Sequence, residues 1–174
     1  ANRFPLDGNT AYKIAQLATK QLMLNHKKQG RPVFIAKDTR KSGDLLEHAV
    51  AAGVASMGAE ARLLGVVPTP AVAYITRELQ GLGGVMISAS HNPFADNGIK
   101  IFGADGYKIS DAIEEAIEKE LIANNRIEMP TGADVGTINI DDSSITFWLN
   151  SLARIAGENV GARKLKIALD CANG

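Results

Sequence analysis

Apolar positions in the first part of the chain switch between a helical period and short strand-like runs. Residues 10–27 place their apolar side chains close to a helical period with a polar opposite face, which predicts a helix. The apolar, partly β-branched run at 33–37 predicts a buried strand. Residues 42–57 predict a second helix, with Ser42 as its N-cap and Gly58 as a left-handed stop.

The same alternation continues through residue 90. Residues 61–66 predict a strand, and residues 67–79 predict a loop that leads into a helix, because proline is tolerated in a first helical turn. Residues 83–90 predict the next strand. Strands that alternate with helices at this spacing are typical of βαβ units, so we expect an α/β fold with helices on both faces of a largely parallel sheet.

The second half of the chain adds elements of another kind. The runs GIKIFG at 98–103 and GYKI at 106–109 predict a hairpin, which would add antiparallel strands at one edge and make the sheet mixed. Further helices are predicted at 110–123 and 141–156, with the polar segment 124–136 as a loop between them.

The last residues predict the beginning of a new unit. After a polar linker, the run LKIALDCANG reads as a buried strand followed by a turn that contains glycine, and no helix follows it. We therefore divide the chain into a first domain at 1–160 and a second part at 161–174, which holds a linker and the first strand of a second domain. This organisation predicts a piece of a longer protein.

Charge and composition exclude several classes of function. Nineteen basic residues balance nineteen acidic ones, so no overall field would attract nucleic acid or an anionic membrane. The most apolar stretch, 49–59, is too short to span a bilayer, and the N-terminal residues do not resemble a secretory signal. Cys171 is the only cysteine, which excludes an intramolecular disulfide and fits a cytoplasmic protein.

The stretch from Ser88 to Ser110 combines the side chains that chemistry requires. It follows a predicted strand directly, at the end where open α/β sheets place their ligands. Ser90 offers a hydroxyl for covalent chemistry, and His91 and Lys100 offer protons or positive charge. On composition alone the segment equally fits a polar loop of turns.

Four segments together resemble one enzyme family. SASHNPFADNGIK resembles the active-site serine loop of the α-D-phosphohexomutase superfamily, and KDTRKSG resembles its early Asp-x-Arg loop. VPTPAVAY is similar to the family's Pro-Thr-Pro segment, and LDCANG to the first strand of its second domain. The segments FADNGIKIF and ALDCANG are most similar to sequences of the bacterial phosphoglucosamine mutase branch, rather than to those of the phosphomannomutase and phosphoglucomutase branch.

The resemblance implies a role for each matching residue. Ser90 would be the phosphoserine that donates and re-accepts a phosphoryl group, and Lys100 would assist proton transfer. His91 and Asn92 match positions that border the phosphoserine. Arg40 matches the arginine of the early loop and is a candidate for binding phosphate.

The resemblance also implies a reaction. The enzyme would interconvert glucosamine 6-phosphate and glucosamine 1-phosphate through a bisphosphate intermediate, for the synthesis of UDP-N-acetylglucosamine and cell-wall precursors. An activating glucosamine 1,6-bisphosphate or glucose 1,6-bisphosphate would serve as cofactor. A homodimer of the full-length enzyme is compatible with the resemblance.

Mg²⁺ is the second cofactor that the resemblance implies. It would be held by the Ser90 phosphate and by aspartates of an Asp-Gly-Asp-x-Asp-Arg loop. That loop is not in this sequence, so the aspartate ligands are expected to lie beyond Gly174. We therefore expect this chain alone to be inactive.

Two other functions fit parts of the sequence. A serine hydrolase is suggested because Ser90 adjoins His91, although neighbours on a strand point to opposite sides and no Gly-x-Ser-x-Gly motif is present. A non-catalytic module that binds phosphosugars or a partner domain is the alternative of another class. Aspartates that invite a metal interpretation are assigned instead to turns and helix N-termini; they are Asp96, Asp105, Asp111, Asp141 and Asp142.

Overall fold

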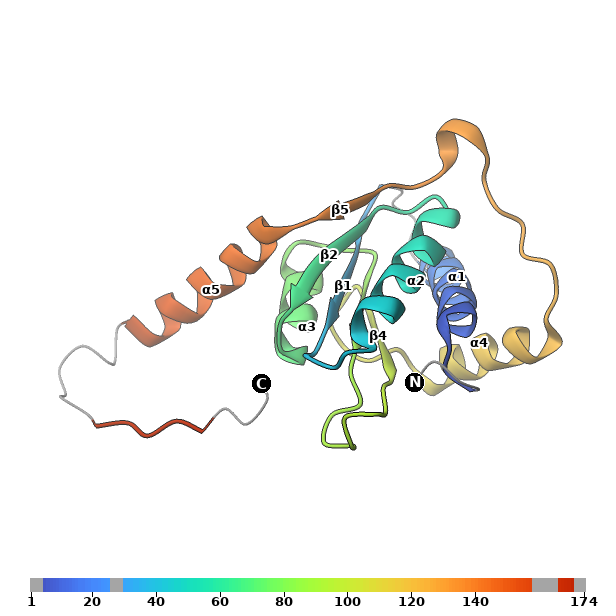
Figure 1. Cartoon of the computed structure of the whole chain (residues 1–174). Helices are drawn as coiled ribbons and strands as arrows, with labels where there is room; N and C mark the ends of the chain where they lie inside the picture. Colours follow the sequence, from blue (N-terminus) through green and yellow to red (C-terminus); the bar gives the residue numbers. More distant parts are fainter. Residues whose placement is uncertain (1–4, 26–29, 158–165, 171–174) are drawn as a thin grey trace.

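A five-stranded sheet forms the centre of the protein in the computed structural model, which describes residues 5–25, 30–157 and 166–170 (Figure 1). The strand order is β4-β3-β1-β2-β5. Four strands run parallel and β4 runs antiparallel to β3, so the predicted mixed, largely parallel sheet is confirmed. The strands are β1 (Val33–Lys37), β2 (Ala61–Val66), β3 (Gly83–Ile87), β4 (Ile99–Gly103) and β5 (Ile138–Ile140).

Helices cover both faces of this sheet, as predicted. On one face α1 and α2 pack against each other and against the strands, and α4 packs against α1. On the other face α3 lies over β1 and β3, and α5 contacts α3 and β2. The helices are α1 (Gly8–Asn25), α2 (Gly43–Ser56), α3 (Thr69–Glu78), α4 (Asp111–Ala123) and α5 (Asp142–Gly157), with a 3₁₀ turn at Gly132–Asp134.

The central strands are apolar on both faces, because helices bury both. In β1, Ile35 belongs to the cluster beneath α1 and α2, whereas its neighbour Phe34 belongs to the cluster beneath α3. This period-2 alternation explains why the run at 33–37 is continuously apolar rather than alternating with polar residues. Gly53 lets α1 and α2 approach closely, since a Cβ there would lie 2.5 Å from the Tyr12 carbonyl oxygen.

Three predicted details of the elements are confirmed only in part. Ser42 occupies the N-cap position of α2, as predicted, but its hydroxyl makes no capping hydrogen bond, and its backbone is already helical. The predicted hairpin forms through a tight turn with Gly106 at φ 78°, but its second run contributes one isolated antiparallel bridge, between Phe102 and Lys108, instead of a strand. The strand predicted at 83–90 ends earlier, at Ile87.

The segment between α4 and α5 contains a strand that the sequence analysis missed. β5 extends the sheet by pairing with β2, in a register that places Ala61 opposite Ile138. All three residues of β5 are exposed, so no pattern of burial marks them. Gly58 has the predicted left-handed conformation, with φ 84°, at the end of α2.

The predicted strand at the end of the chain does not form where the structure describes it. Residues 166–170 are exposed and have no regular secondary structure, because a strand needs a neighbour for its backbone hydrogen bonds. The remainder of that prediction, from Cys171 to Gly174 together with most of the linker, lies outside the described residues. Positions 26 and 27 of the first predicted helix lie outside them as well.

Candidate active site

The segment from Ser88 to Gly98, called the serine loop below, leaves the sheet at the end of β3 and returns as β4. The Ser88 amide donates to the Gly98 carbonyl oxygen at 2.9 Å, which closes the loop at its base. Gly98 allows this close approach, since a Cβ there would lie 2.9 Å from the Ser88 carbonyl oxygen. The loop therefore sits at the carboxyl end of a parallel strand, where α/β sheets place their ligands.

The end of β1 lies beside this loop. Lys37 pairs with Ile87 in the parallel register, and the amide of Asp38 donates to the Ile87 carbonyl oxygen at 3.0 Å. The polar segment that follows β1 therefore meets the serine loop, although about fifty residues separate them in the sequence. Parallel pairing of β1 and β3 explains why these two segments meet.

Ser90 lies on the exposed surface of the loop in a left-handed backbone conformation, with φ 55°. This region is unfavourable for residues with a Cβ, so surrounding contacts must hold it. The Ser90 amide donates to Ser88 Oγ at 3.0 Å. The Ser90 hydroxyl oxygen lies 3.5 Å from Nδ1 of His91, which is longer than the contact expected of a serine and its general base.

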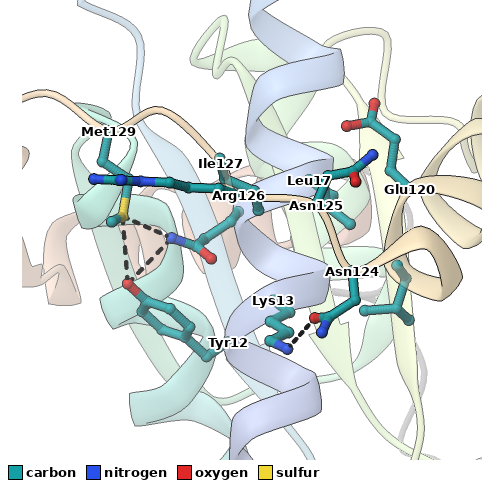
Figure 2. Close-up of a pocket in the computed structure, with 11 residues that line it drawn as sticks. Tyr12, Lys13, Leu17, Glu120, Asn124, Asn125, Arg126, Ile127 and Met129 are labelled. Carbon is teal, nitrogen blue, oxygen red and sulfur yellow. Dashed lines mark hydrogen bonds between the residues drawn. The ribbon is translucent and has the colours of Figure 1, made fainter.

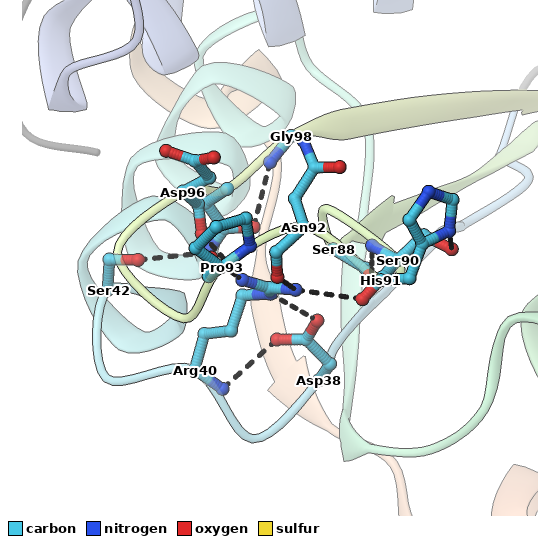
Figure 3. Close-up of polar contacts among 11 residues, drawn as sticks. Asp38, Arg40, Ser42, Ser88, Ser90, His91, Asn92, Pro93, Asp96 and Gly98 are labelled. Carbon is cyan, nitrogen blue, oxygen red and sulfur yellow. Dashed lines mark hydrogen bonds and ion pairs between the residues drawn. The ribbon is translucent and has the colours of Figure 1, made fainter. Parts of the chain in front are cut away.

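Arg40 provides the largest group of polar contacts to the loop (Figure 3). Its Nη2 donates to the carbonyl oxygens of Ser90 at 2.8 Å and Asn92 at 2.9 Å. Its Nη1 donates to those of Pro93 at 2.5 Å and Asp96 at 3.1 Å. The resemblance made Arg40 a candidate phosphate ligand, and the structure places its guanidinium against the backbone of the loop.

A second side chain ties the loop to the beginning of α2. Asn97 donates through Nδ2 to Ser42 Oγ at 3.0 Å, and its Oδ1 accepts from the Gly98 amide at 2.9 Å. The hydroxyl of Ser42 therefore accepts a hydrogen bond from the loop instead of capping the helix. The sequence did not predict this contact, because a serine directly before a helix has the usual pattern of an N-cap.

Among the described residues, the side chains of Lys100 and Asn92 have no hydrogen bonds that tie them to the site. Lys100 is partly buried in β4 opposite Met86, which places its side chain on the face of the sheet covered by α3. Among the described residues, no hydrogen bond or ion pair engages its ammonium group. Asn92 is exposed and is held through its backbone: its amide donates to the Ala89 carbonyl oxygen at 3.1 Å.

Buried charges support the end of β1 beneath the site. The Lys37 ammonium forms ion pairs with Glu47 and, at 2.7 Å, with Asp44. Burial lowers the pKa of Lys37, but hydrogen bonds and attraction from the two carboxylates outweigh burial and raise it above its ordinary 10.5. Lys37 therefore stays charged and fastens the first turn of α2 to β1, next to Asp38.

A separate pocket of about 200 Å³ lies between α1 and the end of α4 (Figure 2). Tyr12 donates to the Met129 sulfur at 3.8 Å on one side, and Lys13 donates to Asn124 Oδ1 at 2.7 Å on the other. None of the residues predicted for the site lines this pocket. It is therefore not part of the serine-loop site.

The described residues by themselves do not form a metal centre. Among them, no group of three or more histidine, cysteine, aspartate or glutamate side chains is arranged to hold a metal ion. Ser90 would be a ligand only through a phosphate, so this part of the chain fits Mg²⁺ as a single donor and not as a complete site. The aspartate ligands expected beyond Gly174 are not part of this chain, and they stay a prediction.

The described residues also lack a membrane-spanning element. Within them, no helix combines the length and the apolar character that crossing a membrane requires.

Comparisons with known proteins agree with the fold and show the family. The model of the phosphoglucomutase/phosphomannomutase family, alpha/beta/alpha domain I, matches residues 1–128. A protein named phosphoglucosamine mutase from Acetivibrio thermocellus is 43% identical over 97% of this chain, and one from Clostridium botulinum is 49% identical over 82%. A phosphoglucomutase/phosphomannomutase family protein from Burkholderia thailandensis superposes with a TM-score of 0.71 over 89% of this chain and 33% of its own, at 24% identity, and supports the fold alone.

The architecture is thus that of an α/β first domain with its candidate site at the carboxyl ends of β1 and β3. The chain belongs to the phosphoglucomutase/phosphomannomutase family, and the curated relatives described above are named phosphoglucosamine mutase. The chain spans about a third of the length of those relatives, 37% and 32% respectively.

Proposed function

We propose that the complete protein containing this chain is a phosphoglucosamine mutase that interconverts glucosamine 6-phosphate and glucosamine 1-phosphate. One observation carries the proposal: the serine loop presents the Ser90 hydroxyl to solvent on a fixed left-handed turn at the carboxyl end of β3. The names of relatives at 43% and 49% identity support the amino-sugar substrate.

In this proposal Ser90 carries the phosphoryl group. The bond between phosphorus and Ser90 Oγ breaks while a bond to a sugar hydroxyl oxygen forms, and the proton of that hydroxyl passes to a nearby base. The neutral amine of Lys100 is our candidate for accepting that proton and passing it to Ser90 Oγ, since no hydrogen bond or ion pair engages the side-chain nitrogen among the described residues. The sugar bisphosphate then returns its other phosphoryl group to Ser90, which restores the phosphoserine.

Apart from the phosphoserine itself, the transfer depends on the position of the reacting groups and on charges that stabilise the moving phosphoryl group. A phosphate on Ser90 brings roughly −1.5 to −2 charges at neutral pH. Mg²⁺ bound to that phosphate would offset part of its charge, with further ligands from outside the described residues. A sugar 1,6-bisphosphate as activator, a homodimer and a cytoplasmic location stay predictions.

The second candidate is a phosphomannomutase or phosphoglucomutase. The description of the matching family model, which names both activities, favours it. We expect kcat/KM of the purified complete protein to be higher for glucosamine phosphates than for glucose or mannose phosphates. A large preference for glucose or mannose phosphates would contradict the amino-sugar assignment and leave the phosphoserine proposal intact.

Replacing the nucleophile tests the phosphoserine. In the complete protein, Ser90→Ala removes the covalent acceptor, so we expect turnover to fall by several orders of magnitude with an unchanged melting temperature. Intact-mass measurement should show one phosphate on the wild type and none on the variant. Ser110→Ala is the matched control, because Ser110 is exposed and makes no side-chain cap.

Two results would contradict this assignment. Near-wild-type turnover in Ser90→Ala would exclude a phosphoserine mechanism. Labelling of Ser90 by a fluorophosphonate, without any phosphate at that position, would instead favour a serine hydrolase with His91 as the base.

A further inference from the structure

Every N–H of the Arg40 guanidinium already has an acceptor within the protein. Arginine carries five such donors in a rigid planar fork. In Arg40 the Nε–H donates to Asp38 Oδ2 at 2.9 Å, and the other four donate to backbone carbonyl oxygens of the serine loop. The side chain is only 9% exposed. Arg40 therefore has no N–H left for a substrate phosphate unless it releases part of the loop.

We propose that Arg40 is a positioning residue, which holds the serine loop in the shape that presents Ser90, and is not a ligand of the substrate phosphate. The proposal deepens the proposed function, because it assumes that Ser90 is the nucleophile. The structural part of the proposal, that the guanidinium of Arg40 fixes the loop, does not depend on that assumption.

Buried apolar contacts contribute little to holding the loop in place. Residues 91–96 are exposed, and Phe94, its largest apolar side chain, is 86% exposed. Its internal backbone hydrogen bonds include two short turns, from Asn92 to Ala89 and from Asp96 to Pro93, besides the closure between Ser88 and Gly98. A loop with so few buried contacts opens easily, and the unfavourable φ of Ser90 adds to that tendency.

One planar group fixes most of this segment at once. The four carbonyl oxygens that Arg40 holds belong to Ser90, Asn92, Pro93 and Asp96 and span most of the loop. Nη2 holds the carbonyl groups of Ser90 and Asn92 together, which sets the peptide plane between Ser90 and His91 and the one between Asn92 and Pro93. The orientation of the Ser90 backbone, and with it the direction of Oγ, follows from these contacts.

Arg40 is itself held from the sheet. Asp38 accepts from the Arg40 amide at 3.0 Å through Oδ1 and from Nε through Oδ2, so one carboxylate holds both ends of the residue. The Asp38 amide is in turn bonded to Ile87, the last residue of β3. The Asp-x-Arg spacing thus connects the rigid ends of β1 and β3 to the loop.

Hydrogen exchange of the complete protein tests the structural part of the proposal directly. In Arg40→Ala and Arg40→Lys we expect the amides of Asn92 and Asp96 to exchange about tenfold faster or more, while the amides of β1 and β3 keep their rates. Lysine should not substitute, because its ammonium is a point donor and cannot reach four carbonyls. Lys41→Ala, at the exposed neighbouring position, is the control and should change nothing.

Kinetics distinguish a positioning residue from a phosphate ligand. We expect Arg40→Lys to lower kcat at least tenfold with KM for the sugar phosphate nearly unchanged, and free guanidinium ions to restore part of the kcat of Arg40→Ala. A higher KM together with unchanged loop exchange would overturn the proposal in favour of direct phosphate binding. Asp38→Asn, which retains an oxygen for the Arg40 amide, should show the same pattern more weakly and serves as the second variant if Arg40→Ala unfolds.

The two readouts separate the two proposals. Faster loop exchange in a protein that has no mutase activity would refute the proposed function and support the positioning role of Arg40. Unchanged exchange in an active mutase would refute the positioning role and leave the proposed function standing.

Discussion

Two irregular segments of the molecule are held in different ways. The serine loop has contacts that converge on one cation, since a single guanidinium holds four of its carbonyl oxygens. Residues 124–137, called the second connection below, join α4 to β5 and make scattered contacts instead. Asn124 accepts from Lys13, Met129 contacts Tyr12 through its sulfur, and the Gly136 amide donates to Ala55 at 2.8 Å.

The difference follows from what each segment must do. Chemistry at one atom requires the surrounding backbone to be fixed within a fraction of an ångström, and convergent hydrogen bonds to a buried charge provide this. The second connection has to carry the chain from α4 to the edge of the sheet. Close backbone contact is enough there: a Cβ on Gly136 would lie 1.9 Å from the Ala59 carbonyl oxygen. We therefore expect changes near the serine loop to affect turnover and changes in the second connection to affect stability.

Replacement of Lys100 has the largest expected effect among the variants that test this difference, and the effect is on turnover. If the side-chain amine of Lys100 accepts the proton of the sugar hydroxyl, Lys100→Ala in the complete protein should lower kcat by ~10²- to 10⁴-fold. The melting temperature should not fall appreciably, because no hydrogen bond or ion pair of Lys100 is present among the described residues. Intact mass should still show phosphate on Ser90.

A matched variant makes that result interpretable. Lys119 is exposed on α4, so Lys119→Ala should leave both turnover and stability unchanged. Equal activity of the two variants would show that Lys100 takes no part in the reaction. It would also contradict the expectation that changes near the serine loop affect turnover.

Gly136 tests the other side of the comparison. The added methyl group in Gly136→Ala would overlap the Ala59 backbone, which cannot move aside as a flexible side chain would, so we expect unfolding to become easier by about 1–3 kcal/mol. Urea denaturation measures this change. The kcat of the folded fraction should equal that of the wild type, because the second connection contains none of the proposed site residues.

Gly132 in the same segment provides the control. It has φ 63° but open space around its Cβ position, so Gly132→Ala should cost only about 1 kcal/mol, from backbone strain. If Gly132→Ala destabilised the protein as much as Gly136→Ala, backbone strain rather than close approach would explain the role of these glycines.

The same contrast explains how much could be predicted from the sequence. β1 and β3 were predicted because both faces of each are buried, and this gives continuous apolar runs. Ser90 was identified because the sequence of its loop resembles that of a known enzyme family. The contact between Arg40 and that loop could not be read from any local pattern, since parallel pairing of β1 and β3 brings the two segments together. β5 was missed for a related reason, because its three exposed residues become a strand only through the edge of β2.

Asp141 gives the smallest expected effect, at the start of α5 directly after β5, where the sequence predicted a helix N-terminus. Its Oδ1 accepts from the Ser144 amide at 3.0 Å, as an N-cap does, and Arg62 lies 3.5 Å from Oδ2. Asp141→Asn keeps a capping oxygen but removes the negative charge at the helix N-terminus and beside Arg62, so it should cost about 0.3–1 kcal/mol of unfolding free energy. Ser110→Ala at the start of α4 should cost almost nothing, because Ser110 makes no side-chain cap.

The pH dependence of stability tests whether the charged form of Asp141 is the one that stabilises the folded protein. Burial raises the pKa of its carboxyl, but hydrogen bonds from Ser143 and Ser144 and the nearby Arg62 outweigh burial and hold the pKa below its ordinary 3.8. The unfolded chain therefore binds this proton more readily than the folded protein does. The stabilisation is present in full above about pH 3.8 and is lost as the pH falls through the lower folded value. In urea denaturation the difference between wild type and Asp141→Asn should accordingly shrink in strongly acidic buffer. A difference independent of pH would show that the variant loses hydrogen bonds from Ser143 and Ser144 rather than the effect of the charge.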